Sequence, residues 1–245
     1  MAEMQEWNLN LTRFIINSIN STGFISAIIE GERRLGKSAY AIKNMASVFY
    51  KIDGTTEQES WDKALDNMIF SPEQLMNKIE QRTADEQIDH VWCIDDAAVH
   101  FSGYLYFINV YQTAYLQGMF DTIGTVTNSL LLTCPKKRRL MSGLRYYDDY
   151  CIQIIKKDNW NRIAKGIKWF TVPDGKQHFR KMFEDHYSCY LPKAVFDKYM
   201  IQRKMYLKEI GKKLREMKED LEKRKKRVPF DVEPDEVLEA EGNEF

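Results

Sequence analysis

Residues 31–38 read G-E-R-R-L-G-K-S, a spacing that carries the chemistry of a phosphate-binding loop. Backbone N–H groups can wrap a phosphate chain only where the loop turns sharply, and glycine tolerates the positive φ angles of such turns. In that arrangement Lys37 reaches the β- and γ-phosphates, and the Ser38 hydroxyl coordinates Mg²⁺. The alternative is a surface turn with incidental charge. The pattern predicts that ATP and Mg²⁺ are bound by Gly31, Glu32, Arg33, Arg34, Leu35, Gly36, Lys37, Ser38 and Ala39.

A second stretch, I-D-H-V-W-C-I-D-D at 88–96, is an apolar run that ends in two acids. Burying carboxylates without partners is costly, and a hydrated Mg²⁺ is their natural partner. Asp95 would hold the water shell of the metal, with Asp96 directly beside it. The alternative is a strand that meets an aspartate-capped helix beginning at Ala97.

Three further features are candidates for contact with nucleotide or DNA. A polar residue, Thr133 or Asn128, stands at the end of another apolar strand. The basic run 136–139 would bind phosphates of ATP or DNA, or would form a solvated helix start. Arg145 would complete the site of its own chain or that of a neighbouring subunit in a homo-oligomer.

The elements that must position these residues follow from the hydrophobic pattern and the turn signals. An apolar strand before the loop and a helix after it are the context that a phosphate-binding loop requires. An Asp158-Asn159 turn indicates an antiparallel hairpin at the sheet edge. The fold class expected is α/β, a three-layer sheet that is mainly parallel, with that edge hairpin and a long C-terminal helix. Strands are expected over 24–29, 68–70, 91–94, 129–134, 150–156 and 163–172, and helices over 8–19, 39–46, 60–67, from Pro72, and over 98–120 with Gly103 as its breaking point.

The chain divides into three expected segments: a nucleotide-binding domain (1–191), a basic amphipathic helix (192–228) and a disordered acidic tail (229–245). The helix has 13 basic and 5 acidic residues from Lys198 to Arg227, and the tail from Asp231 has seven acids and no base. The helix would bind nucleic acid or a partner, or it would be a solvated helix balanced by its own tail. An a/d seam typical of a coiled coil, with Arg203 interrupting it, consists of Met200, Leu207, Ile210, Leu214, Met217 and Leu221.

Composition excludes several classes of protein. With 29% charged residues and no apolar run near eighteen residues, the chain has no expected membrane span. The polar N-terminus is unlike a signal peptide, so a cytoplasmic location is expected. The four cysteines contain no C-x-x-C pair, and the spacing of His178, His186 and Cys189 fits no standard metal site. The aromatic residues over 98–120 would stack on nucleic-acid bases, or would belong to the core or an interface.

The loop at 31–38 and the acids Asp95 and Asp96, separated by strand–helix units, resemble those of P-loop ATPases of the additional-strand class, which includes the AAA+, RecA and HerA/FtsK groups. The segments I-F-S-P-E-Q-L and V-W-C-I-D-D-A-A-V-H-F also resemble ATPases of archaeal viruses and plasmids. Asp96 stands where the class usually has the glutamate that polarises the attacking water, so the resemblance implies that Asp96 positions this water. It also implies that Thr133 or Asn128 senses the γ-phosphate.

Three functions remain compatible with the sequence. The resemblance implies an ATP-hydrolysing protein that acts on DNA during replication or packaging of a virus or plasmid. Asp96 and the heptad seam favour an assembly or regulatory protein with weak hydrolysis instead. A nucleoside or small-molecule kinase is the third, and the lack of a lid with paired arginines argues against it.

Overall fold

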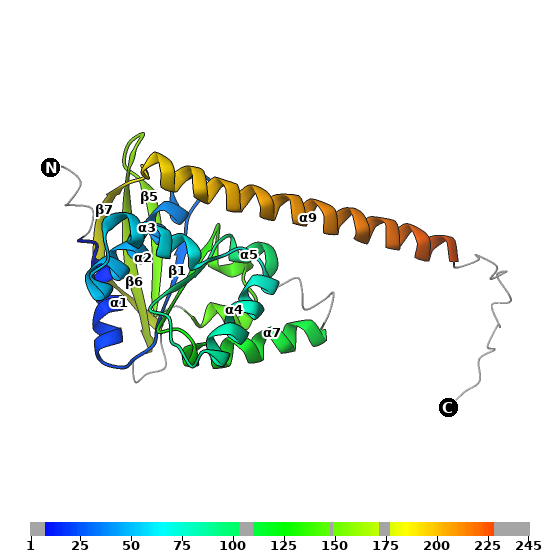
Figure 1. Ribbon diagram of the computed structural model, residues 1–245, viewed down its shortest axis with the longest axis horizontal. Helices are drawn as coiled ribbons and strands as arrows, with labels where there is room; N and C mark the ends of the chain where they lie inside the picture. The colour runs from blue at the N-terminus through cyan, green and yellow to red at the C-terminus, as the bar shows by residue number, and fades with distance from the viewer. Residues whose placement is uncertain (1–7, 103–109, 148, 172–176, 228–245) are drawn as a thin grey trace, which may run out of the picture. The chain divides into compact units, whose positions relative to one another are not determined.

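The computed structural model describes residues 8–102, 110–147, 149–171 and 177–227 (Figure 1). A seven-stranded sheet with the order β2-β3-β4-β1-β5-β6-β7 forms the centre of this part of the chain. The first five strands in this order are parallel, and β6 and β7 are antiparallel. The strands are β1 (Ile25–Glu30), β2 (Met68–Ile69), β3 (Trp92–Ile94), β4 (Ser129–Cys134), β5 (Tyr150–Lys156), β6 (Asn161–Thr171) and β7 (Gln177–Ser188). The helices are α1 (Asn10–Asn20), α2 (Lys37–Asp53), α3 (Glu57–Asp66), α4 (Pro72–Ala84), α5 (Ala97–His100), α7 (Val110–Thr122), α8 (Ser142–Arg145) and α9 (Lys193–Arg227).

The order of the central strands decides where the candidate site lies. Strand β4 is inserted between β1 and β3, with Ile29 opposite Thr133 and Leu132 opposite Ile94. Since these strands are parallel, their carboxyl ends meet at one edge of the sheet. The loop after β1, the acids after β3 and the end of β4 are therefore neighbours in space.

Both faces of the parallel strands are covered by helices, which explains their uninterrupted apolar sequences. On one face Ile28, Trp92 and Leu130 pack in a cluster with Phe101 and Phe120, to which α4, α5, α7 and α8 contribute. Helix α2 is buried along most of its length and contacts α1, α3, β1 and β4. Figure 1 shows the sheet between these two groups of helices.

Two helices begin at strong capping signals: α4 begins at Pro72 as expected, whereas α3 begins at Glu57, before the expected Ser60. Thr56 and Glu59 form a capping box at α3, in which each side chain bonds the backbone N–H of the other. At α4 the Ser71 hydroxyl accepts from the N–H of Gln74, and Pro72 occupies the first helical position. These caps fix the chain on both sides of β2, which is only two residues long.

The expected α/β class, the mainly parallel sheet, the antiparallel edge and the long C-terminal helix are all confirmed. The helix expected over 98–120, with a break at Gly103, is found as short α5 and separate α7, and the segment 103–109 lies outside the described residues. Phe101 and Phe120 are buried in the core, which favours the structural reading of these two aromatic residues.

Strand β7 has no counterpart in the sequence-based expectation. Its inward side chains alternate as Phe183, Asp185 and Tyr187, so a charged residue stands in the middle of the buried set. On its other face His186 is exposed and Glu184 is partly exposed. A buried aspartate on an edge strand hides the period-two pattern that identifies strands in a sequence.

Two compact units make up the chain, Met1–Arg203 and Lys204–Phe245. The first turns of α9 therefore belong to the first unit. The tail at 229–245 lies outside the described residues, as do the side chains of Ile210, Leu214, Met217 and Leu221, so the coiled-coil seam stays a prediction. No helix among the described residues has both the length and the apolar character needed to cross a bilayer.

Asp185 joins three elements in the interior. One of its oxygens accepts the backbone N–H of Asn10 at 2.8 Å and the side-chain amide of Asn10 at 2.7 Å. The other accepts the hydroxyl of Tyr40 at 2.6 Å. Helix α1 has no cap from its own sequence, so a carboxylate of β7 caps it and interacts favourably with its dipole.

We expect Asp185→Ala to lower the free energy of unfolding by about 3 kcal/mol, because it leaves buried donors of Asn10 and Tyr40 without an acceptor. Urea denaturation would measure this loss. Asp66→Ala, at an exposed position in α3, is the matched control and should change stability by less than about 0.5 kcal/mol. Equal losses in the two variants would contradict the role given to Asp185.

Candidate functional site

The loop from Gly31 to Ser38 connects β1 to α2 and turns back through two left-handed residues. Arg34 has a φ of 62° and Gly36 a φ of 83°, and Gly36 directly precedes the helix. A Cβ added to Gly36 would lie 2.4 Å from Sγ of Cys189. Glycine is therefore required at position 36 for its backbone conformation and for the close approach of the chain after β7.

The antiparallel edge of the sheet braces this loop. The carbonyl oxygen of Leu35 accepts from Nε of Arg162 at 3.2 Å and from Sγ of Cys189 at 3.8 Å. The carbonyl oxygen of Gly36 accepts from the hydroxyl of Tyr187 at 3.1 Å. These donors turn the loop carbonyls towards β6 and β7. Sequence reasoning missed all three residues, because nothing local links them to the loop.

Lys37 is folded back onto its own loop. Its ammonium group donates to the carbonyl oxygens of Gly31 at 2.9 Å and Glu32 at 2.8 Å, and the residue is only 7% exposed. Burial lowers the pKa of Lys37, while the nearby charges of Asp96 and Asp95 oppose that shift. The ammonium group is thus held by the loop carbonyls, near the charges of both acids.

Asp95 lies at the centre of the site and is 1% exposed. Its Oδ1 accepts from the Ser38 hydroxyl at 2.6 Å and from the Thr133 hydroxyl at 2.7 Å. Its Oδ2 accepts from the Tyr199 hydroxyl at 2.8 Å. The two residues expected to hold Mg²⁺, Ser38 and Asp95, are therefore in direct contact.

Asp96 begins α5 in a left-handed conformation, with a φ of 48°, and its N–H donates to Thr133 at 2.8 Å. Its side chain forms an ion pair with the guanidinium of Arg203. Burial and the neighbouring Asp95 raise the pKa of Asp96, whereas Arg203 and Lys37 act in the opposite direction. Asp96 is thus a carboxylate whose charge is balanced by a cation from α9.

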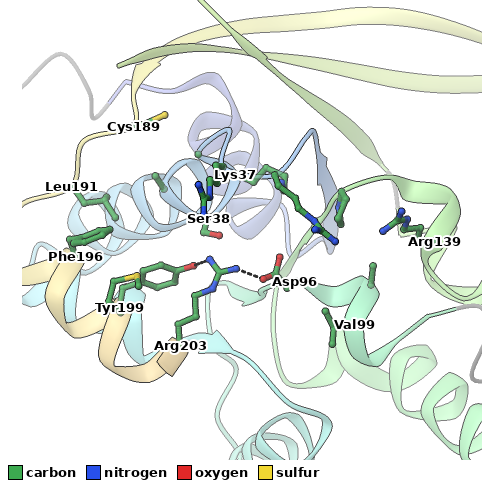
Figure 2. Close-up of a pocket in the computed structure, with 17 residues that line it drawn as sticks. Lys37, Ser38, Asp96, Val99, Arg139, Cys189, Leu191, Phe196, Tyr199 and Arg203 are labelled. Atoms are coloured by element: carbon green, nitrogen blue, oxygen red, sulfur yellow. Dashed lines mark hydrogen bonds and ion pairs between the residues drawn. The ribbon is translucent and has the colours of Figure 1, made fainter. Parts of the chain in front are cut away.

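Tyr199 and Arg203 reach the site from the first turns of α9, one helical turn apart. Nη1 of Arg203 donates to the Tyr199 hydroxyl at 2.8 Å, and Figure 2 shows Arg203 between Tyr199 and Asp96. Because the Tyr199 hydroxyl donates to Asp95, the two residues bond both acids in a single chain of hydrogen bonds. Sequence reasoning did not include them in the site. The available signal was the interruption of the apolar seam by Arg203, because a charged residue in such a seam needs a partner.

Lys37, Ser38, Asp96, Tyr199 and Arg203 line a cleft of about 560 Å³, a size typical of small-molecule sites. Five cationic side chains face it, against the single carboxylate of Asp96. Such a balance favours an anionic ligand. The cations are Arg33, Arg34, Lys37, Arg139 and Arg203.

The remaining residues expected at the site are placed differently. Gly31, Glu32 and Leu35 line a second cleft together with 136–138, and Ala39 lines the first.

Thr133 is fully buried and bonds Asp95 and Asp96, so it does not line the first cleft. Asn128 lies before β4, at the opposite edge of the sheet from Thr133. Arg145 is also outside the cleft lining, and its Nε donates to the carbonyl of Leu140 at 2.8 Å.

Within the described part of the chain, no group of three or more His, Cys, Asp or Glu side chains could hold a metal ion. Mg²⁺ does not require such a cage, because it usually takes one or two protein carboxylates together with phosphates and waters. The Ser38 hydroxyl and the Asp95 carboxylate supply the hard oxygen donors that this ion prefers, so the donor set fits.

No protein-family model matches the chain. Over 225 residues it is 25% identical to the uncharacterized protein B-251 of Sulfolobus spindle-shape virus 1, which covers 89% of this chain and 88% of that protein. Over 139 residues it is 28% identical to the uncharacterized protein ORF286 of Acidianus two-tailed virus, covering 56% of this chain and 45% of that protein. The N-terminal domain of zonular occludens toxin from Neisseria meningitidis overlaps 71% of this chain and 98% of that domain, at 13% identity and a TM-score of 0.43. The relatives found by sequence are thus proteins of archaeal viruses.

We expect Gly36→Ala to lower the free energy of unfolding by about 2–4 kcal/mol, the sum of left-handed strain and overpacking against Cys189. Gly54→Ala separates the two effects, because Gly54 also has a positive φ of 62° but no atom lies within 4 Å of its added Cβ. That control should lose about 1 kcal/mol. Adding Cys189→Ala to Gly36→Ala should restore part of the loss in thermal denaturation. Equal effects of the two glycine substitutions would contradict the packing argument.

Proposed function

We propose that this protein is a P-loop ATPase of the additional-strand class that binds ATP with Mg²⁺ in the cleft and hydrolyses it. The observation that carries the proposal is the 2.6 Å hydrogen bond between Ser38 and Asp95. It joins a glycine-rich loop at a helix start to an acid that ends a buried strand, which is the arrangement that nucleotide phosphates and their metal require. The position of β4 between β1 and β3 also supports that class.

Each residue at the site then has a role. The loop N–H groups and Lys37 bind the phosphates, and Lys37 exchanges its bonds to the loop carbonyls for phosphate oxygens. Ser38 and Asp95 hold the metal ion, which neutralises charge on the β- and γ-phosphates. Thr133 and Tyr199 fix the orientation of the Asp95 carboxylate through their hydroxyls. Thr133 would respond to the γ-phosphate only through Asp95.

Asp96 would orient the attacking water and accept its proton as the oxygen bonds to the γ-phosphorus and ADP leaves. In the described conformation Arg203 neutralises Asp96. We infer that Arg203 moves to the γ-phosphate when ATP is bound, because a triphosphate carries more charge than one carboxylate and Arg203 lines the same cleft. Asp96 is then free to act on water.

The ion pair also favours the second candidate, an assembly or regulatory protein with weak hydrolysis. If Arg203 stays on Asp96 with ATP bound, the carboxylate is a poor base and turnover is slow. A rate on the order of 1 s⁻¹ or more, the lower end for ordinary enzymes, would exclude that candidate.

We extend the proposal to action on DNA by a homo-oligomer. Support for DNA is the excess of basic residues between Lys198 and Arg227, together with the basic run 136–139. Arg145 is intermediate in exposure and absent from the cleft of its own chain, which is compatible with a role in the site of a neighbouring copy.

We expect Lys37→Ala to abolish ATP turnover, with and without added DNA, because the phosphates lose the buried cation of the loop. Phosphate release would measure turnover, and isothermal titration would measure ATP affinity. Lys51→Ala, in the last turn of the same helix, is the control and should leave both unchanged. Normal turnover in Lys37→Ala would exclude the assignment of this loop.

We expect Arg203→Gln to weaken ATP binding about tenfold while ADP affinity stays unchanged, because only ATP offers the γ-phosphate to the guanidinium. The neighbouring Lys204→Gln, at an exposed position of α9, is the control. If Arg203→Gln instead raised turnover without changing ATP affinity, Arg203 would inhibit hydrolysis by pairing with Asp96 and would not contact the γ-phosphate.

A further inference from the structure

The end of the β6–β7 hairpin extends beyond the rest of the sheet. Strand β5 pairs with β6 only as far as Ile167, whereas β6 and β7 remain paired to Thr171 and Gln177. Residues 168–171 and 177–180 therefore form a two-stranded ribbon, here called the outer ribbon. Two strands alone are marginally stable in water. The side chains of the outer ribbon are therefore considered for a role other than stabilising the sheet.

Large aromatic side chains are exposed on both faces of the outer ribbon. Trp169 and Phe179 are directly opposite each other, with ring centroids 5.4 Å apart and exposed fractions of 44% and 65%. On the other face Phe170, 45% exposed, stacks on His178 at 6.2 Å. Because a ribbon has no interior, neither pair belongs to the hydrophobic core.

The outer ribbon is also cationic. Lys168 is directly opposite Arg180 on the face of Phe170, and like charges in that position destabilise a strand pair. No aspartate or glutamate occurs in 161–171 or 177–183. The cross-strand ring pairs stabilise the ribbon, and Nζ of Lys168 lies 5.8 Å from the ring centroid of Tyr150. These contacts do not account for rings that remain about half exposed beside unbalanced charge, so a ligand is the better explanation for the combination.

The chemistry of that ligand follows from the two kinds of side chain. Rings offer flat surfaces for stacking, and the adjacent cations offer partners for a regularly spaced anion. A nucleic acid supplies both, and its bases are free to stack on protein rings only when they are unpaired. We propose that the outer ribbon binds single-stranded nucleic acid through Trp169, Phe170 and Phe179, with Lys168 and Arg180 on the phosphates. This site is independent of ATP binding.

Fluorescence anisotropy with a labelled deoxythymidine oligonucleotide about 20 nucleotides long tests the stacking, because such a strand has no pairing of its own. Trp169→Ala and Phe179→Ala should each weaken binding about tenfold, within the range measured for the loss of one base–aromatic stack. Trp160→Ala is the matched control, since Trp160 is 69% exposed but lies at the opposite end of β6. It should bind like the unaltered protein.

The salt dependence of binding tests the cations separately. Lys168→Gln and Arg180→Gln should each reduce the slope of log K against log salt by about 0.7, the value for one phosphate contact on a single strand. Trp169→Ala should leave that slope unchanged, because stacking releases no counterion. Lys157→Gln, an exposed lysine near the β5–β6 turn, is the control and should not alter the slope.

Several results would overturn the proposal. One is an unchanged affinity for the oligonucleotide in Trp169→Ala and Phe179→Ala. Another is that the unaltered protein binds a duplex of the same length equally well. A third is that the ribbon substitutions weaken binding to phosphatidylserine vesicles but not to the oligonucleotide. Circular dichroism melting would confirm that each variant is folded. Lys37→Ala should keep full oligonucleotide affinity, so failure of the ATP proposal and failure of this one are distinguishable.

Discussion

The burial of the Asp95 carboxylate is the constraint on which the site depends. A carboxylate that is 1% exposed is stable only if hydrogen bonds replace its lost hydration. Three hydroxyls do so, and they come from the loop helix α2, from β4 and from α9. One acid therefore connects elements that are distant in the chain, and a change in any of them alters how the acid is held.

The second constraint acts on the loop at 31–38. Its carbonyls at Leu35 and Gly36 are bonded by side chains of the antiparallel edge, so the loop is held by a part of the sheet that supplies neither of the two acids. The same edge strand supplies Asp185, which joins α1 to α2 behind the loop. The antiparallel strands β6 and β7 thus support the site, whereas the residues of the site itself lie at the carboxyl ends of β1, β3 and β4.

Helix α9 is divided between the two compact units of the chain. Its first turns hold Tyr199 and Arg203 against the two acids, within the compact unit that ends at Arg203. The basic residues that follow belong to the second unit. Arg203 is thus the last residue of the first unit. A change in what Arg203 binds would occur directly before the basic residues of the second unit.

The sequence by itself determined the local features. These are the loop at 31–38, the acids Asp95 and Asp96 at a strand end, and the mainly parallel α/β class, because residue type, spacing and hydrophobic period are local signals. Only the tertiary structure decided which distant side chains complete the site. Tyr199, Arg203 and the bracing residues on β6 and β7 are ordinary in their own segments and acquire a role only through contacts across the fold. Strand β7 was missed for the same reason: its buried aspartate is stable only because α1 and α2 supply partners that no local pattern contains.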